Sequence, residues 1–297
     1  MISVSAGFPG GIDTADQKEW STVNMMFDVL IRLGCILFAI TTAVMLRREW
    51  RRHRRRHPRF PIPKVCLQDV DERFRIDSVE RAREGVVAFI SNSDNHLPAT
   101  PSDLETYVLT LLAKRASHLF EFGTCSGRTT YLWALNSPVD ARITTLTLPP
   151  DDVQMELSPE MQGNDIQHAI SESSFDRFVY SDTSVEAKIE QLFQDSATLD
   201  TGPYQGKMDL IFVDGGHSYA YVKNDSDKAL EMVAPGGMII WHDYRGRRCK
   251  ETEGVYRYLN ELSGTYPLQL VDGTSLVVYR HPSDRTVVLP TTSGQAA

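Results

Sequence analysis

Three short stretches of the chain hold the residue types that carry out chemistry: E-F-G-T-C-S-G at 121–127, D-G-G-H at 214–217 and H-D at 242–243. Carboxylates close to imidazoles can hold a divalent cation or move a proton. A turn bracketed by glycines lets a ligand approach the backbone closely. Because both acidic stretches follow apolar runs, each is expected at the end of a strand, where open α/β sheets bind their ligands.

The spacing of the glycine turn excludes two common phosphate sites. A dinucleotide fingerprint needs G-x-G-x-x-G, whereas here three residues separate Gly123 from Gly127, and no Gly-Lys-Ser/Thr follows as in a P-loop. The next expected strand also ends near Thr147 and not at an acidic residue. Glu121 stands two positions before the first glycine, where a carboxylate would repel pyrophosphate and attract a cation. The turn therefore indicates a nucleoside ligand that carries a positive charge and no phosphate.

Strand and helix patterns alternate through the region that carries these stretches. We expect strands at 118–122, 141–148, 178–181, 208–213 and 238–241, helices at 129–135, 185–193, 219–233 and 252–262, and a closing hairpin from strands at 268–271 and 276–279. A capping box at Ser102 and Glu105 opens a further helix that runs to about 116. Strands such as D-L-I-F-V-D are apolar without alternation, as strands covered on both faces are. The fold class is therefore α/β, with a doubly wound, mostly parallel seven-stranded sheet closed by a C-terminal antiparallel hairpin.

In their order and spacing, these stretches resemble the class I S-adenosylmethionine-dependent methyltransferases. The resemblance is carried by E-x-G-x-x-x-G, F-D-R-F-V-Y-S-D-T, M-D-L-I-F-V-D-G-G-H-S-Y and A-P-G-G-M-I-I-W-H-D-Y, and it covers about residues 100–281. The last two stretches narrow it to the macrocin O-methyltransferase and cephalosporin biosynthesis methyltransferase-like group. The resemblance implies a Rossmann-like fold, S-adenosyl-L-methionine as cofactor and methylation of an acceptor hydroxyl.

The resemblance also implies where the cofactor binds. Its methionine part would lie on the turn after the first strand, and its ribose and adenine at the ends of the next two strands. The implied contacts are Glu121, Gly123, Thr124, Cys125, Ser126 and Gly127 for the methionine, Thr147 for the ribose, Ser181, Asp182 and Thr183 beside the adenine, and Asp214 at the fourth strand end. Members of the family usually hold the ribose with an acidic residue, so Thr147 departs from the pattern.

The expected catalytic residues are Asp214, His217 and Asp243, at the ends of the fourth and fifth strands. The resemblance implies a divalent cation, Mg²⁺ or another, held by Asp214, His242 and Asp243, where it would lower the pKa of an acceptor hydroxyl. Because His242 stands where a second aspartate is often found, removal of the hydroxyl proton by His217 is the alternative route. Each residue also has a structural interpretation: Asp214 as a helix cap, His217 as a hydrogen-bonding side chain at the strand end, and His242 as a packed side chain.

An apolar stretch at 23–46, interrupted by Asp28 and Arg32, lies close to the N-terminus. As a helix it would reach about 36 Å, enough to cross a bilayer core of about 30 Å. Eight arginines and one glutamate follow it at 47–59, in a chain whose net charge is -8. The positive-inside rule places this basic run in the cytoplasm, against anionic lipids. We therefore expect a single-pass membrane protein with a cytoplasmic catalytic domain; an interfacial amphipathic helix, or nucleic-acid binding by the arginines, is the less favoured interpretation.

The expected domain organisation follows from these boundaries. A short non-cytoplasmic tail at 1–22 and the transmembrane helix at 23–46 precede a basic juxtamembrane linker at 47–64, a methyltransferase domain at 65–282 and a flexible tail at 283–297. The four cysteines show neither a disulfide framework nor metal-ligand spacing, and we expect free thiols.

The leading hypothesis is a membrane-tethered O-methyltransferase that acts on a hydroxyl of a sugar, a glycolipid or a small metabolite. One alternative is a membrane-anchored scaffold that binds S-adenosylmethionine without turning it over. Another is an NAD(P)-dependent oxidoreductase, which the glycine spacing disfavours. A homo-oligomer is compatible with the resemblance, although no interface can be identified from the sequence.

Overall fold

The computed structural model describes residues 14–56, 61–91, 101–148, 173, 175, 177–247 and 249–283. The chain divides into two compact units, Met1–Arg59 and Phe60–Ala297. The first unit contains the helix α1 (Thr14–Arg56). The helices of the second are α2 (Leu67–Val70), α3 (Val79–Glu84), α4 (Asp103–Ala113), α5 (Arg128–Asn136), α7 (Tyr219–Met232) and α8 (Glu253–Leu262). Short 3₁₀ turns lie at η1 (Glu72–Phe74), η2 (Glu186–Lys188), η3 (Ser196–Thr198) and η4 (Gly202–Tyr204).

The second unit is built on a single eight-stranded sheet with the order β1-β7-β8-β6-β5-β2-β3-β4. The strands are β1 (Lys64–Val65), β2 (His118–Phe122), β3 (Arg142–Thr147), β4 (Ile189–Phe193), β5 (Met208–Val213), β6 (Val233–Trp241), β7 (Gln269–Val271) and β8 (Val277–Arg280). Neighbouring strands run parallel except where β8 lies antiparallel to both β6 and β7. The predicted doubly wound sheet with a closing hairpin is therefore confirmed, with one strand more than the seven expected. The extra strand, β1, has only two residues, too few to form a recognisable pattern.

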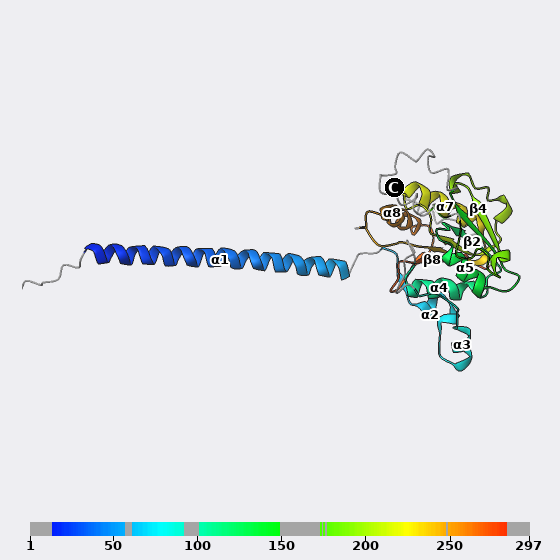
Figure 1. Cartoon of the computed structure of the whole chain (residues 1–297), viewed down its shortest axis with the longest axis horizontal. Coiled ribbons are helices and arrows are strands. Elements are labelled where there is room, and N and C mark those ends of the chain that lie inside the picture. The colour runs from blue at the N-terminus through cyan, green and yellow to red at the C-terminus, as the bar shows by residue number, and fades with distance from the viewer. Residues whose placement is uncertain are drawn as a thin grey trace, which may run out of the picture. The chain divides into compact units, whose positions relative to one another are not determined.

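Helices cover both faces of this sheet, which explains its uninterrupted apolar strands. Along β5, Ile211 and Val213 pack with α7 and α8 on one face, while Leu210 and Phe212 pack with α4 and α5 on the other. Figure 1 shows α7 and α8 on the opposite side of the sheet from α4 and α5. Strands β3 and β4 are added to the sheet on one side of β2, and β5 and β6 on the other. The carboxyl ends of the parallel strands β2 and β5 therefore form the switch point at which such sheets bind ligands.

The third strand of the parallel half differs from the prediction. We expected a strand at 178–181 and a helix at 185–193, but the first segment forms turns and the second contains β4. β4 pairs in parallel with β3 from Ile143–Ile189 to Thr147–Phe193. An edge strand with one partly covered face needs few apolar residues, and their spacing there also fits a surface helix. The segment forms a strand because its backbone pairs with β3, and this long-range pairing cannot be recognised from the local sequence.

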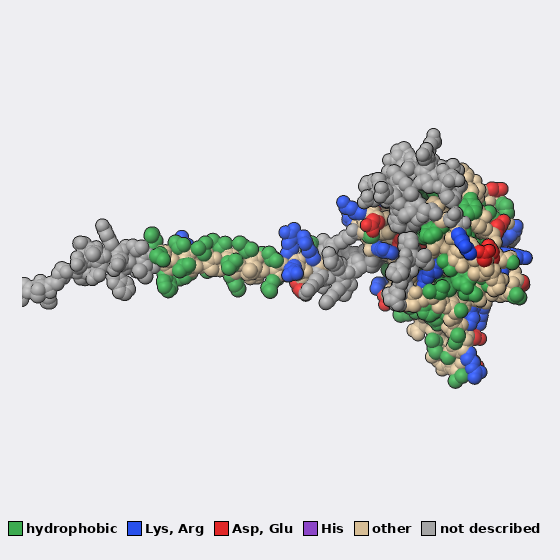
Figure 2. All heavy atoms as spheres, viewed as in Figure 1, with side chains coloured by type: hydrophobic (Ala, Val, Ile, Leu, Met, Phe, Trp, Pro, Cys, Tyr) green, Lys and Arg blue, Asp and Glu red, His purple; other side chains and the backbone are tan. Residues whose placement is uncertain are grey.

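The helix α1 contains a candidate membrane span at Met25–Arg51, whose hydropathy reaches 2.3. Its described side chains are exposed, and Figure 2 shows apolar side chains along it. A signal sequence or the core helix of a soluble protein can have the same length and composition, so the helix alone is weak evidence for a span. The membrane location therefore stays a prediction.

Candidate active site

The glycine turn after β2 requires glycine at two positions for the same two reasons, its backbone conformation and the close approach of a neighbour. Gly123 has φ +98°, and a Cβ there would lie 2.2 Å from the carbonyl oxygen of Asp214, at the end of β5. Gly127 has φ +76°, and a Cβ there would lie 2.7 Å from the ring of Tyr180. The left-handed backbone and the absence of a side chain together let the turn pack between β5 and the loop that carries Tyr180.

Glu121 is buried beneath this turn, with 1% of its surface exposed. Its Oε2 accepts hydrogen bonds from the hydroxyls of Thr130 on α5 and Thr145 on β3. Burial raises the pKa of Glu121 to about 8, although the two threonines act to lower it, and the charge of Asp214 raises it further. This carboxyl group therefore joins β2, β3 and α5 under the turn, an arrangement that the sequence motif alone did not indicate.

A chain of hydrogen bonds ties the turn to β4. The hydroxyl of Thr124 lies 2.8 Å from that of Thr145 and accepts a hydrogen bond from Nε2 of Gln191 at 3.2 Å. The hydroxyl of Tyr180 donates to Oε1 of Gln191 at 2.5 Å. Because Thr145, Gln191 and Tyr180 come from three segments outside the turn, the turn is fixed from the side of the sheet where β3 and β4 lie.

The predicted adenine residues Ser181, Asp182 and Thr183 lie in the loop before β4. This loop contacts the turn through a hydrogen bond from the N–H of Val179 to the carbonyl of Ser126, at 2.9 Å. The Ser181 and Thr183 hydroxyls bond within the loop, and Asp182 pairs with Arg177. They were expected to follow a strand at 178–181, which forms turns instead, and their place beside the adenine stays a prediction.

Asp195 and Ser196, rather than those three residues, follow the third strand of the parallel half. Asp195 accepts hydrogen bonds from the N–H of Ala197 at 2.8 Å and from the hydroxyl of Tyr221 at 3.2 Å. Sequence reasoning missed both residues because it treated 185–193 as a helix. The polar Q-D-S run directly after the apolar end of β4 was the signal that would have located them. Thr147 does lie at the end of β3, as expected.

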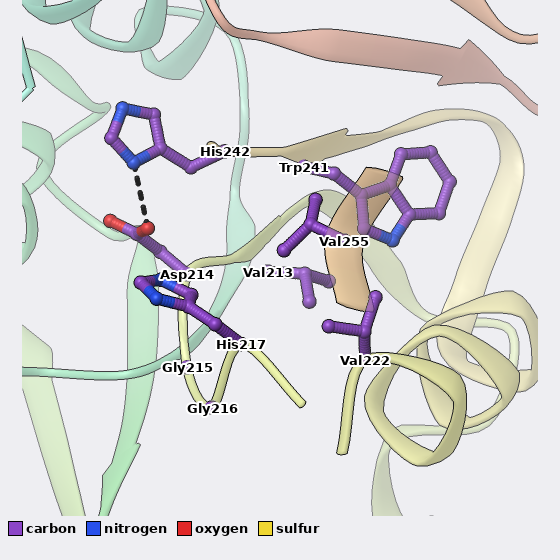
Figure 3. Close-up of a pocket in the computed structure, with 9 residues that line it drawn as sticks. All are labelled: Val213, Asp214, Gly215, Gly216, His217, Val222, Trp241, His242 and Val255. Carbon is purple, nitrogen blue, oxygen red and sulfur yellow. Dashed lines mark hydrogen bonds and ion pairs between the residues drawn. The ribbon is translucent and has the colours of Figure 1, made fainter. Parts of the chain in front are cut away.

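The ends of β5 and β6 bring the remaining candidates together; Figure 3 shows Asp214, His217 and His242. Oδ1 of Asp214 lies 2.8 Å from Nδ1 of His242, and Nε2 of His217 lies 3.0 Å from Oδ2 of Asp243. Asp243 has φ +62°, a conformation that ordinary residues rarely adopt. A small pocket beside them is lined by Val213, Asp214, Gly215, Gly216, His217, Val222, Trp241, His242 and Val255. The four residues predicted to do chemistry therefore form two carboxylate–imidazole pairs.

The charges within this cluster shift the pKa values of its members in opposite directions. Burial acts to raise the pKa of Asp243, but the hydrogen bond from His217 and the charges of His242 and Arg245 hold it well below its usual range. The pKa of Asp214 is raised, mainly by burial and against the effect of His242. Burial opposes the charged form of His242, yet Asp214 and Glu105 raise its pKa well above the usual value. Asp243 therefore remains ionised and can orient His217.

The donor set fits a metal less well than the prediction assumed. Ligand atoms of Asp214, His217 and Asp243 all lie within 4.8 Å of one another, close enough to share an ion, whereas the ring of His242 is engaged by Asp214. Oδ2 of Asp243 faces His217, while Oδ1 makes no hydrogen bond among the described residues but lies 2.6 Å from Nη2 of Arg245 as an ion pair. An ion would have to displace these groups or lie beside a guanidinium charge. The arrangement suits proton transfer better than metal binding.

Comparison with known proteins gives one family match. Residues 120–244 match the model of a family described as a methyltransferase domain. This segment begins in β2 and ends just after β6, so it contains the glycine turn and both carboxylate–imidazole pairs. A search of curated proteins finds no match.

Solved methyltransferases have weakly similar folds. The O-methyltransferase TomG from Streptomyces achromogenes is 19% identical, with a TM-score of 0.42, over 61% of this chain and 82% of that one. PaMTH1, a methyltransferase from Podospora anserina, is 18% identical, with a TM-score of 0.43, over 62% and 80%. The N-methyltransferase NodS from Bradyrhizobium japonicum is 18% identical, with a TM-score of 0.41, over 60% and 85%.

These likenesses are too distant to add to the family match. The match itself runs from within β2 to just after β6 and contains the glycine turn and both carboxylate–imidazole pairs. Residues 120–244 therefore resemble a methyltransferase domain.

Proposed function

We propose that the chain transfers the methyl group of S-adenosylmethionine to a hydroxyl oxygen. The observation that carries this proposal is the pairing of His217 with the ionised Asp243 at 3.0 Å, next to the switch point of the sheet. A hydroxyl is a poor nucleophile until its proton is removed, and an imidazole oriented by a carboxylate is a suitable base. The glycine turn at 123–127 would hold the cofactor beside this pair.

His217 would act as the general base. With Nε2 donating to Asp243, the basic lone pair of the neutral ring is on Nδ1, and the acceptor's proton moves there as its oxygen attacks. S-adenosylmethionine supplies a methyl group on a positively charged sulfur, which leaves with the electron pair of the carbon–sulfur bond. Asp243 would stabilise the imidazolium that forms, as the carboxylate does in other histidine-based sites.

We further propose that the acceptor is a sugar, a glycolipid or a small metabolite close to a membrane. The candidate span in α1 motivates this part of the proposal, since a tether would keep the domain near lipid-linked hydroxyls. The test is to incubate the full chain with S-adenosylmethionine labelled in its methyl group, together with methyl glycosides or a total lipid extract. We expect label in an alkali-stable ether. Cofactor binding without labelling of any acceptor would instead favour the non-catalytic scaffold.

Removing divalent cations should leave this activity intact. Because His217 and Arg245 already engage both oxygens of Asp243, we expect treatment with EDTA followed by dialysis to change kcat by less than about 2-fold, since the base is an imidazole. Label transfer measured before and after chelation tests this. If activity disappears and returns on addition of Mg²⁺ or Mn²⁺, the metal-assisted route is correct and the imidazole route is not.

The membrane tether predicts how the chain partitions. If the segment Met25–Arg51 spans a bilayer, the full chain should remain in the membrane pellet after an alkaline carbonate wash. A variant that lacks residues 1–56 should move to the supernatant. Recovery of the full chain in the supernatant would contradict the proposed span.

A further inference from the structure

Glu105 accepts hydrogen bonds from two segments that are far apart in the sequence. It lies in the first turn of α4, and its side chain is 8% exposed. Its Oε2 accepts from the N–H and the hydroxyl of Ser102, both at 2.8 Å, which completes the capping box of the helix. Its Oε1 accepts from the N–H and the hydroxyl of Ser275, both at 2.7 Å, in the turn between β7 and β8. Both oxygens of the Glu105 carboxylate therefore accept hydrogen bonds.

This carboxylate also reaches the second carboxylate–imidazole pair. Oε2 of Glu105 lies 3.5 Å from Nε2 of His242, whose Nδ1 lies 2.8 Å from Oδ1 of Asp214. The side chain of His242 is 4% exposed, so water has little access to compete for either ring nitrogen. A continuous path thus runs from α4 through the end of β6 to the end of β5.

A capping role alone does not explain this geometry. A capping box needs only the contact between the glutamate and the N-cap residue, which here is Ser102. The bonds to Ser275 and the approach to His242 add nothing to the helix end. They hold the carboxylate where its Oε2 lies 3.5 Å from the imidazole.

We propose that Glu105 is a positioning residue of the methyl-transfer site, acting on Asp214 through His242. The imidazole ring can rotate about its bond to Cβ. The hydrogen bond between Nδ1 and Asp214 holds it on one side, and the charge of Glu105 lies 3.5 Å from Nε2, which makes no hydrogen bond among the described residues. His242 in turn holds Asp214, whose backbone carbonyl borders Gly123 of the cofactor turn. Glu105 therefore sets the position of the β5 end without touching either substrate. This inference rests on the proposed function for its kinetic consequence.

The kinetic test compares Glu105→Gln with Ser102→Ala in the full chain, with labelled S-adenosylmethionine and the acceptor found in the glycoside and lipid screen. Glu105→Gln keeps the volume but removes one acceptor oxygen, whereas Ser102→Ala weakens the cap and leaves the Ser275 and His242 contacts. We expect Glu105→Gln to lower kcat about 10-fold, the lower end for loss of such a supporting contact, with KM for the cofactor changed less than about 2-fold. Ser102→Ala should lower Tm and change kcat by less than about 2-fold, because the N–H at position 102 still donates to Oε2 and the bonds from Ser275 remain.

A second measurement requires no turnover. In the full chain labelled with ¹⁵N-histidine, the ring signals of His242 should shift in Glu105→Gln and stay in place in Ser102→Ala. Glu105→Asp, which keeps the charge but cannot reach all its partners, should shift the same signals and serves if the glutamine variant fails to fold. Unmoved ring signals, or equal losses of kcat in Glu105→Gln and Ser102→Ala, would overturn the proposal. If the wild-type protein shows no transferase activity, the proposed function is refuted. The contact between Glu105 and His242 is not refuted by that result, because the ring signals test it separately.

Discussion

Replacing His217 with glutamine should lower kcat by about 10²–10⁴-fold, the usual contribution of a general base. Glutamine can still donate a hydrogen bond to Asp243, but it cannot accept a proton from a hydroxyl. Binding of S-adenosylmethionine should change little, because the proposed cofactor contacts lie on the turn at 123–127. Label transfer gives kcat, and calorimetry with the cofactor gives the dissociation constant.

His118→Gln is the matched control for this variant. His118 lies exposed at the start of β2, at the opposite edge of the sheet from the strand ends that form the site. Its replacement should leave kcat unchanged. If His217→Gln retains wild-type turnover, His217 is not the base, and a structural hydrogen bond at the strand end becomes the correct interpretation.

Replacing Gly123 with alanine should destabilise the domain by about 3 kcal/mol or more, since overpacking and a left-handed backbone conformation each cost energy. The new Cβ would lie 2.2 Å from the carbonyl oxygen of Asp214 and 2.6 Å from its carbonyl carbon. Both are backbone atoms of a central strand end, so neither can move without disturbing β5. Chemical denaturation measures the free energy of unfolding, and calorimetry should detect no cofactor binding.

Gly206→Ala separates the energetic cost of the left-handed backbone from that of the steric clash. Gly206 also has a left-handed backbone, with φ +65°, but a Cβ there would meet nothing within 4 Å. Its replacement should cost only about 1 kcal/mol, the conformational part of the effect, and leave cofactor binding unchanged. Equal costs at the two glycines would mean that the close approach of the turn to β5 is not as described.

Strong local patterns made the centre of the fold predictable. The strands at 118–122 and 208–213 were predicted with the bounds that the structure gives, because each is a short apolar run followed by glycines. The helix at 219–233 ends within one residue of the prediction. Since ligands bind at the carboxyl ends of such strands, the cluster around Asp214 and Asp243 could also be predicted from their positions alone.

Long-range contacts made other features unpredictable. β4 is identified by its pairing with β3, and its apolar residues are too few to separate a strand from a helix. The end of the third parallel strand was therefore expected at 181, whereas Asp195 and Ser196 follow that strand in the structure. The capping box at Glu105 was visible locally, but its bonds to Ser275, 170 residues away, were not. The contact between Arg245 and Asp243 was not visible in the sequence either. The positive charge of Arg245 beside Asp243 weakens the metal prediction.

A crystal structure of the chain with S-adenosylhomocysteine tests the central claim most directly. The account predicts that the ligand's amino-acid part lies on residues 123–127, that its sulfur faces the pocket beside His217, and that no ion is bound between Asp214 and Asp243. A ligand bound elsewhere on the sheet, or a metal ion coordinated by Asp214 and Asp243, would contradict it.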